Sequence, residues 1–173
     1  MTNGWVVVDT NVLLVAEGRS SYTLTCRAAC GDVLNDIRMN KIVVLDSGRE
    51  ILREYGNKLA VKKGQPGLGY AFWKWLVNTT LSHDRCETVD LTENLERVYD
   101  EFPDHEGLRE FDRSDRKFVS VAAAHPSKPY IVQAGDSKWW GWRISLKECG
   151  IELQLPCEAE LKAKWEEKVG RSD

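Results

Sequence analysis

The chain of 173 residues lacks any apolar run of about 18 residues, the length that a membrane-spanning helix needs. Its first residues contain no basic segment followed by an apolar stretch, so they do not resemble a secretory signal. Low-complexity segments, internal repeats and long linkers are absent as well. We therefore expect a single domain over residues 1–173, located in the cytoplasm.

Positive charge is also scarce, because 24 Lys and Arg stand against 27 Asp and Glu, for a net charge of −3. Nucleic-acid-binding domains are usually basic, so a protein of that class would need a local basic surface or bound cations. The glycine-rich phosphate-binding patterns G-x-x-x-x-G-K-[S/T] and G-x-G-x-x-G are missing too. A fold built around a nucleotide cofactor is therefore not expected.

The five cysteines form no C-x-x-C pair, and Cys26 and Cys30 have the spacing that places two side chains on one face of a helix. Such a pair is either half of a metal site or two small buried apolar residues. No matching Cys/His pair occurs elsewhere in the chain. The sequence therefore favours buried, reduced thiols in a reducing compartment.

Short apolar runs alternate with helical patterns along the whole chain. Gly31 leaves open whether residues 23–39 form one helix or two. The alternation predicts an α/β fold, a three-layer α/β/α sandwich around a central, mostly parallel sheet. We expect strands near 5–8, 42–45, 87–91, 130–132 and 151–155, and helices near 12–16, 23–39, 48–59, 69–81, 92–102, 116–124, 137–147 and 158–168.

Acidic residues recur where these strands end or these helices begin. In a parallel sheet such positions share one edge, which is also where ligands bind, so carboxylates far apart in sequence are expected to meet there. Converging carboxylates repel one another unless a cation neutralises them. Mg²⁺ and Mn²⁺ prefer oxygen ligands, and either ion can activate water and stabilise charge on a phosphodiester. The acids are Asp9, Glu50, Glu54, Asp112, Asp115 and Asp136.

Each acid also has a purely structural interpretation. Asp9 and Asp115 occupy positions that suit helix caps. Glu50 and Glu54 suit a solvated helix face, and Asp136 suits a turn. Their shared place at one edge of the expected sheet nevertheless favours a common site.

Three segments resemble motifs of the PIN-domain nucleases, in the same order along the chain. Residues 6–14, VVVDTNVLL, resemble the opening strand, Asp-Thr-Asn and apolar helix of that family. Residues 114–122, SDRKFVSVA, resemble its third motif, in which an Asp leads an alanine-rich helix. Residues 130–139, YIVQAGDSKW, resemble its fourth motif, so the resemblance extends over roughly residues 5–155.

The resemblance implies a PIN-like, Rossmann-type fold, a Mg²⁺ or Mn²⁺ cofactor and endonucleolytic hydrolysis of RNA. Asp9, Glu54, Asp115 and Asp136 would be the catalytic, metal-binding acids. Glu54 is preferred to Glu50, one helical turn earlier, because the family's Glu usually lies well inside its helix. Many members are toxins of toxin–antitoxin pairs, so an antitoxin-like protein partner or a homodimer is a further expectation.

The chain departs from the family pattern in two places. Lys138 stands where an additional acid is common, and Gln133-Ala134-Gly135 replace the usual Thr-containing approach to Asp136. These departures leave the number of metal ions open.

Other residues near the expected edge are candidates for supporting roles. Glu50 and Asp112 are candidate auxiliary acids, and Asn11 and Ser137 could orient a carboxylate or a water molecule. The run Trp139-Trp140-Gly141-Trp142 could stack on unpaired bases, although core packing is favoured. Candidate nucleic-acid-binding residues are Arg53, Lys62, Lys63, Arg116 and Lys138.

Three alternatives to an RNA-cleaving enzyme differ in substrate or in activity. A structure-specific DNA nuclease would use the same acids. A non-catalytic PIN-like scaffold would bind RNA or protein, but degenerate members usually lose acids that this chain retains. A phosphotransferase of the haloacid-dehalogenase type needs a second Asp two residues after the first, and position 11 is Asn.

Overall fold

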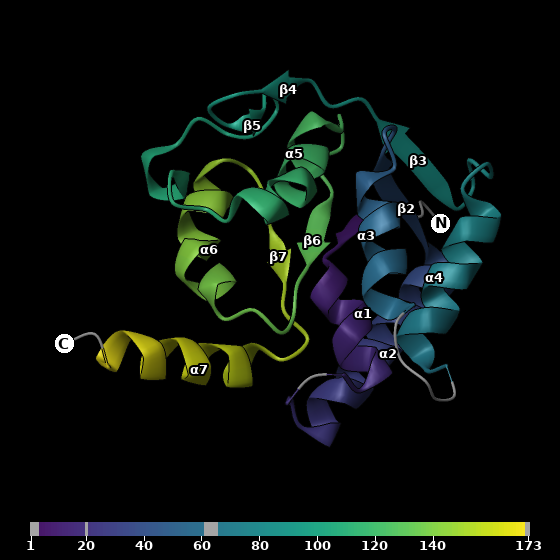
Figure 1. Ribbon diagram of the computed structural model, residues 1–173, viewed down its shortest axis with the longest axis horizontal. Coiled ribbons are helices and arrows are strands. Elements are labelled where there is room, and N and C mark those ends of the chain that lie inside the picture. Colours follow the sequence, from purple (N-terminus) through teal and green to yellow (C-terminus); the bar gives the residue numbers. More distant parts are fainter. Residues whose placement is uncertain (1–3, 20, 61–65, 172–173) are drawn as a thin grey trace.

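The computed structural model of the protein describes residues 4–19, 21–60 and 66–171 (Figure 1). Helices flank a central sheet, which confirms the predicted α/β/α sandwich. The strands of this sheet are β1 (Gly4–Val8), β2 (Lys41–Asp46), β3 (Cys86–Val89), β6 (Tyr130–Val132) and β7 (Leu153–Gln154). The α-helices are α1 (Thr10–Glu17), α2 (Leu24–Asn40), α3 (Glu50–Leu59), α4 (Leu68–Thr79), α5 (Arg116–Ala124), α6 (Lys138–Glu148) and α7 (Glu158–Gly170).

The strand order of the sheet is β3-β2-β1-β6-β7, and each pairing is parallel. From β1 the chain moves outward through β2 to β3 and then returns to β6, on the other side of β1. The order therefore reverses between β1 and β6, and crevices that bind ligands form at such switch points. Val8 pairs with Val132 at the ends of these two strands. The residues that follow β1 and β6 are thus brought together by the sheet.

The continuous apolar runs of the sequence form strands that are covered on both faces. Val6, Val7 and Val8 have no exposed surface, as expected for a parallel strand between two helical layers. Helix α5 packs against β1, β2 and β6, and its Phe118 and Val119 are also fully buried. Such packing holds the beginning of α5 in a defined position at the edge of the sheet.

The short helix predicted within residues 92–102 is wrong. This segment forms a small antiparallel hairpin of β4 (Glu93–Asn94) and β5 (Val98–Tyr99). The Asn94 side chain accepts hydrogen bonds from the Glu96 and Arg97 N–H groups at 2.9 and 3.0 Å, and the Glu101 carboxylate accepts one from the Thr92 N–H. Side-chain bonds to the backbone compete with helix formation, so they override the helical spacing of the apolar residues.

Helix α2 is continuous through Gly31, which settles the choice between one helix and two. A Cβ atom at Gly31 would lie 2.7 Å from Leu68 Cδ1, at the start of α4. The glycine therefore lets α2 and α4 approach closely instead of breaking the helix.

The interpretation of all five cysteines as separate reduced thiols is wrong for two of them. Cys26 on α2 and Cys157, which precedes α7, form a disulfide with a Cα–Cα distance of 5.4 Å. Cys30, Cys86 and Cys149 are free thiols, and Cys30 is buried as expected. The error arises because 131 residues separate the bonded cysteines, which only the tertiary fold brings together.

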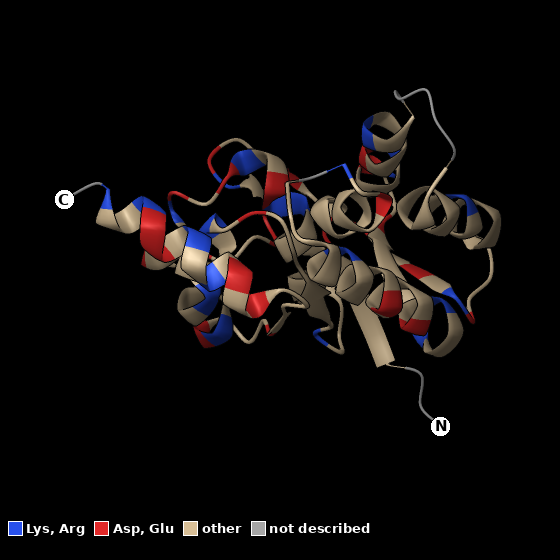
Figure 2. Ribbon diagram, turned by 90° about the horizontal axis from the view of Figure 1, so that it is seen from below, with Lys and Arg blue, Asp and Glu red and all other residues tan. Residues whose placement is uncertain are grey.

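Helix α7 matches the charged C-terminal helix expected from the sequence, and side chains of both signs occur along it (Figure 2). It lies beside α6, at one end of the molecule (Figure 1). Among residues 4–19, 21–60 and 66–171, no helix has the length and apolar character needed to span a membrane.

Candidate metal centre

Asp9 follows β1 directly and caps helix α1. Its backbone is extended, and its carboxylate Oδ2 accepts a hydrogen bond from the Asn11 N–H at 3.0 Å. Its own N–H donates to the Val132 carbonyl at 2.9 Å, which ties it to the end of β6. Only 1% of Asp9 is exposed. The cap interpretation is therefore correct, but it does not explain why the carboxylate is buried among other acids.

Glu54 lies in the middle of α3 and turns toward the end of β1. Its Oε1 accepts a hydrogen bond from Thr10 Oγ1 at 2.7 Å, and its Oε2 forms an ion pair with Lys117. Glu50, one turn earlier, is instead exposed and pairs with Arg53 at 2.6 Å. The structure thus places Glu54 with the other acids and leaves Glu50 at the surface.

Three further carboxylates come together near the start of α5. Asp115 ends the short 3₁₀ helix Arg113–Asp115, and its side chain forms no capping hydrogen bond to α5. Carboxylate oxygens of Asp112, Asp115 and Asp136 lie within 4.8 Å of one another. Asp136 Oδ1 accepts the backbone N–H of Lys138 at 3.0 Å, and the Lys138 ammonium pairs with Asp112 at 2.9 Å. Asp112 is therefore one member of this group of three acids, and Lys138 partly neutralises it.

Burial and mutual repulsion raise the pKa values of Asp9 and Asp115. Burial, followed by the charge of Asp115 and then those of Glu54 and Asp136, raises the pKa of Asp9 well above its usual range, although the Asn11 N–H opposes the rise. Burial, then Asp136 and Glu54, raises the pKa of Asp115 to about 6, while Lys117 opposes the rise. These interactions join Asp9, Glu54, Asp115 and Asp136 into one electrostatic cluster.

Lys117 is a site residue that the sequence alone did not single out. Only 8% of it is exposed, and its ammonium binds both the Glu54 carboxylate and the Ser114 carbonyl. A lysine inside an apolar helix, two residues after Asp115, is the signal that could have revealed it, because Lys is rarely buried without a partner. Lys117 neutralises one of the converging charges and holds Glu54 in place.

The two candidates for orienting roles occupy different surroundings. Asn11 contributes its backbone N–H to Asp9, as described above. Ser137 is 2% exposed, and its hydroxyl accepts a hydrogen bond from the Lys168 ammonium of α7 at 2.8 Å. A positive charge is thereby held next to Asp136, from an element far along the chain.

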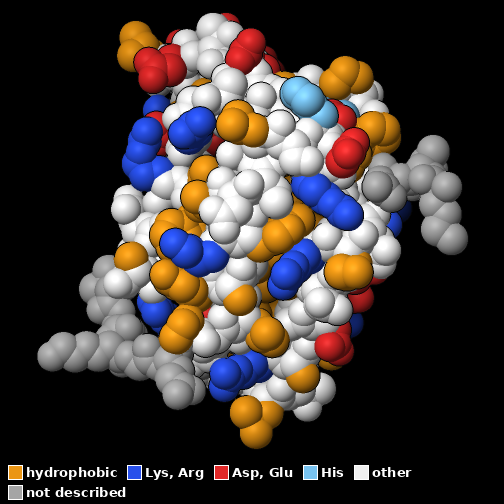
Figure 3. Space-filling view, turned by 90° about the vertical axis from the view of Figure 1, so that its right-hand side faces the viewer, with side chains coloured by type: hydrophobic (Ala, Val, Ile, Leu, Met, Phe, Trp, Pro, Cys, Tyr) orange, Lys and Arg blue, Asp and Glu red, His pale blue; other side chains and the backbone are white. Residues whose placement is uncertain are grey.

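The candidate nucleic-acid-binding residues differ in their access to solvent. Arg116 is buried, and its guanidinium donates to the carbonyls of Phe111, Arg97 and Arg109, so its assignment as a phosphate contact does not hold. Arg53 and Lys138 are solvent-exposed, although each pairs with an acid. Lys62 and Lys63 lie outside the described residues. On the side of α4, Lys and Arg side chains spread over the middle of the surface (Figure 3).

The tryptophan run after Asp136 contributes to packing, as favoured from the sequence. Trp139 is fully buried, with its ring 5.0 Å from that of Phe111, and Trp142 stacks on the same ring at 4.3 Å. This packing anchors the start of α6, and with it the turn that carries Asp136.

The turn that carries Asp136 requires glycine at position 135. Gly135→Ala should therefore have a measurable effect. The φ of Gly135 is +86°, and an added Cβ would lie 3.0 Å from the Asn11 Cβ. The positive φ alone costs a residue with a side chain about 1–2 kcal/mol. Gly150→Ala is a matched control, because its φ is +79° and no atom lies within 4 Å of the added Cβ.

We expect urea denaturation to show a larger loss of unfolding free energy for Gly135→Ala than for Gly150→Ala. Contact with Asn11 also displaces the turn before Asp136, so metal affinity should fall for the first variant alone. Equal losses in both properties for the two variants would contradict this account of the turn.

The raised pKa of Asp115 predicts how the stability of the metal-free protein depends on pH. Its pKa rises from an ordinary 3.8 to about 6 in the folded chain, so the folded state binds the proton more tightly than the unfolded state. This contribution to stability is fully present below pH 4 and is lost as the pH rises through 6. In EDTA, thermal unfolding should show the loss over this window, and Asp115→Asn should reduce it. A slope unchanged in Asp115→Asn would refute the assignment.

Comparison with known proteins identifies no relative. No family model matches the chain, and no curated protein or solved structure is significantly similar to it. Inferences about activity therefore start from the residues of this site.

Proposed function

We propose that the protein is a divalent-metal-dependent endoribonuclease with a PIN-like active site. The observation that carries the proposal is the burial of Asp9, which is 1% exposed, against the charges of Asp115, Glu54 and Asp136. The four acids come from four separate segments of the chain and meet at the switch point of a parallel sheet. Structural capping gives no reason for this concentration of negative charge.

The donor set of the cluster fits Mg²⁺ or Mn²⁺. Carboxylate oxygens are the ligands that these hard ions prefer. Lys117 pairs with Glu54, and Lys138 pairs with Asp112. These two ammonium groups do not cancel the charges of the other carboxylates, which still repel one another. A divalent cation held by Asp9, Asp115 and Asp136, with Glu54 beside them, would remove this repulsion.

The residues of the chain prepare the site for phosphodiester hydrolysis. A bound cation supplies Lewis acidity that activates water and stabilises the charge developing on the phosphate. Thr10 and Lys117 fix the two oxygens of Glu54, and the Asn11 N–H fixes Asp9. Acids held rigidly in this way need little reorganisation during the reaction, which is the main source of electrostatic catalysis.

RNA as the substrate rests on the resemblance of the three motifs to PIN-domain nucleases. We also propose the cytoplasm as the protein's location, where RNA is available as a substrate. The same resemblance supports a toxin role with an antitoxin-like partner protein, or a homodimer. Support for contact with a polyanion comes from the exposed Arg53 and Lys58 of α3, the helix that also carries Glu54.

Cleavage of labelled single-stranded RNA and of DNA of the same sequence tests the proposal, with Mn²⁺, Mg²⁺ or EDTA present. We expect RNA to be cut with either metal ion and left intact in EDTA. Cutting of DNA alone would replace the RNA assignment with a DNA nuclease. If neither polymer is cut and calorimetry shows no heat of Mn²⁺ binding, the catalytic proposal is wrong and a non-catalytic scaffold replaces it.

A further inference from the structure

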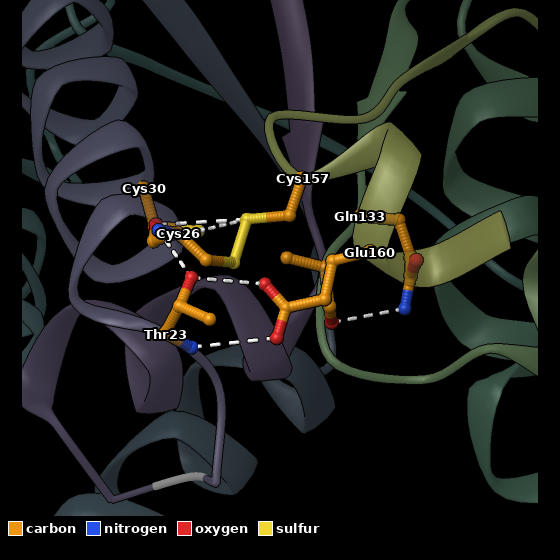
Figure 4. Close-up of a disulfide and its surroundings, with 7 residues drawn as sticks. Thr23, Cys26, Cys30, Gln133, Cys157 and Glu160 are labelled. Carbon is orange, nitrogen blue, oxygen red and sulfur yellow. Dashed lines mark hydrogen bonds between the residues drawn. A yellow bond between two sulfur atoms is a disulfide. The ribbon is translucent and has the colours of Figure 1, made fainter. Parts of the chain in front are cut away.

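A second cluster of metal-ligating side chains, which shares no residue with the acidic one, lies between α2 and the start of α7 (Figure 4). Cys26 and Cys30 are one helical turn apart on α2, and Cys157 comes directly before α7. Their sulfur atoms all lie within 4.8 Å of one another. The three residues are 3%, 0% and 8% exposed. The fold has thus brought three buried sulfur atoms together from two distant segments.

The geometry of the cluster resembles that of thiolates around one metal ion. Two sulfurs bound to Zn²⁺ at 2.3 Å in a tetrahedral arrangement lie about 3.8 Å apart. The Cys30 thiol donates a hydrogen bond to the Cys157 sulfur at 3.9 Å, and no covalent bond joins the two atoms. The third sulfur, that of Cys26, is joined to Cys157 by the disulfide. Breaking that bond would therefore convert the cluster into a set of three ligands.

The carboxylate of Glu160 lies near the disulfide, outside the 4.8 Å group that the three sulfur atoms form (Figure 4). Glu160 lies three residues after Cys157 on α7, and its carboxylate accepts hydrogen bonds from the Thr23 hydroxyl at 3.0 Å and the Thr23 N–H at 3.4 Å (Figure 4). Structural zinc sites have four ligands. The N-terminal end of α7 also stabilises a thiolate at Cys157, because the helix dipole is positive there.

We propose that reduction of the Cys26–Cys157 disulfide opens a site for one soft divalent cation of the Zn²⁺ class, bound by Cys26, Cys30 and Cys157 with Glu160 as the fourth ligand. The reductant is a dithiol, which becomes a disulfide as the bond between Cys26 and Cys157 is reduced to two thiols. The cation then forms three bonds to sulfur, and three protons leave for the solvent. Thiolate ligands select soft or borderline ions, whereas the acidic cluster selects hard ones.

The site would fasten α7 to α2 in either redox state. The disulfide does so in the oxidised protein, and the cation does so after reduction. The same helix carries Lys168, which reaches Ser137 beside the acidic cluster. The cysteine site is nevertheless independent of the proposed nuclease activity, since it shares no ligand with the acids.

Binding of Cd²⁺, a spectroscopic substitute for Zn²⁺, tests the proposal on the full chain after reduction by a dithiol and its removal without oxygen. We expect an ultraviolet thiolate-to-Cd²⁺ charge-transfer absorption that saturates at one ion per chain and persists in excess Mg²⁺. The oxidised protein should show none. Alkylation followed by mass spectrometry should show that Cd²⁺ protects Cys26, Cys30 and Cys157 and leaves the reactivity of Cys149 unchanged.

Two variants provide a matched comparison. Cys30→Ser should weaken Cd²⁺ binding by about a hundredfold or more, while Cys86→Ser, which also removes a buried free thiol, should bind as the wild type does. No saturable absorption in the reduced wild type, or equal binding by the two variants, would overturn the site. Where Cys30→Ser does not fold, the alkylation pattern of the wild type decides, and protection of fewer than three cysteines refutes the proposal.

Discussion

Asp9→Asn is expected to abolish metal-dependent RNA cleavage without unfolding the protein. Removal of an outer-shell partner of a metal ligand already costs roughly 10- to 100-fold in activity or affinity, and a direct ligand should cost more. The amide oxygen of Asn can still accept the Asn11 N–H, so the cap of α1 is retained. Burial and neighbouring acids disfavour the charge of Asp9, so its removal should leave the metal-free protein at least as stable at neutral pH.

Cleavage rates, Mn²⁺ calorimetry and thermal unfolding in EDTA together check this expectation. The control is Asp32→Asn, the same chemical change at an exposed position on α2. Mn²⁺ should raise the melting temperature of the wild type and of the control, but not that of Asp9→Asn. A variant that still binds Mn²⁺ and cuts RNA at the wild-type rate would exclude Asp9 from the site.

Glu54→Gln and Glu50→Gln are expected to differ sharply, although the two residues are one helical turn apart. Glu54 interacts with Asp9 and Asp115, whereas Glu50 is exposed and paired with Arg53. Cleavage should fall by about tenfold or more for Glu54→Gln and by less than about twofold for Glu50→Gln. Because the Gln side chain is neutral, Glu54→Gln also removes the ion-pair partner of the Lys117 ammonium. A fully buried pair broken in this way loses about 3–5 kcal/mol, and we expect roughly 1–3 kcal/mol because 23% of the Glu54 side chain is exposed.

The two effects of Glu54→Gln can be separated by a second change. Lys117→Met removes the orphaned ammonium, so Glu54→Gln combined with Lys117→Met should regain stability while cleavage remains low. Activity and stability are measured at a temperature where circular dichroism shows each variant to be folded. If Glu50→Gln were the variant that lost cleavage and Mn²⁺ binding, the assignment of Glu54 would be wrong.

The sequence predicts that the acids lie close together, because their positions follow from short patterns that mark where strands end and helices begin. Buried strands read as apolar runs, and α5 reads as an apolar helix that follows Asp115. Once the strands are parallel, the residues that follow them share one edge, so Asp9 and Asp136 had to be neighbours. The catalytic and metal-binding roles of these acids remain predictions.

Sequence patterns do not distinguish Glu54 from Glu50, because both lie on one helix near the expected edge. The resemblance to the nuclease family favoured Glu54, and only the packing of α3 beside α1 and α5 shows which side chain turns inward. Lys117 was missed for a related reason. A lysine at the start of a helix normally reaches solvent, and its burial depends on an acid contributed by another helix.

Sequence patterns were enough to predict the α/β class, the positions of the strands and most helices, and the edge at which the acids gather, because apolar periodicity and capping act over a few residues. They did not predict the hairpin of residues 93–99, where side-chain bonds to the backbone outweigh helical spacing. The meeting of Cys157 with Cys26 and Cys30 was decided by the tertiary structure alone. Contacts across 127 and 131 residues depend on where the segment before α7 meets α2, and no local pattern encodes that position.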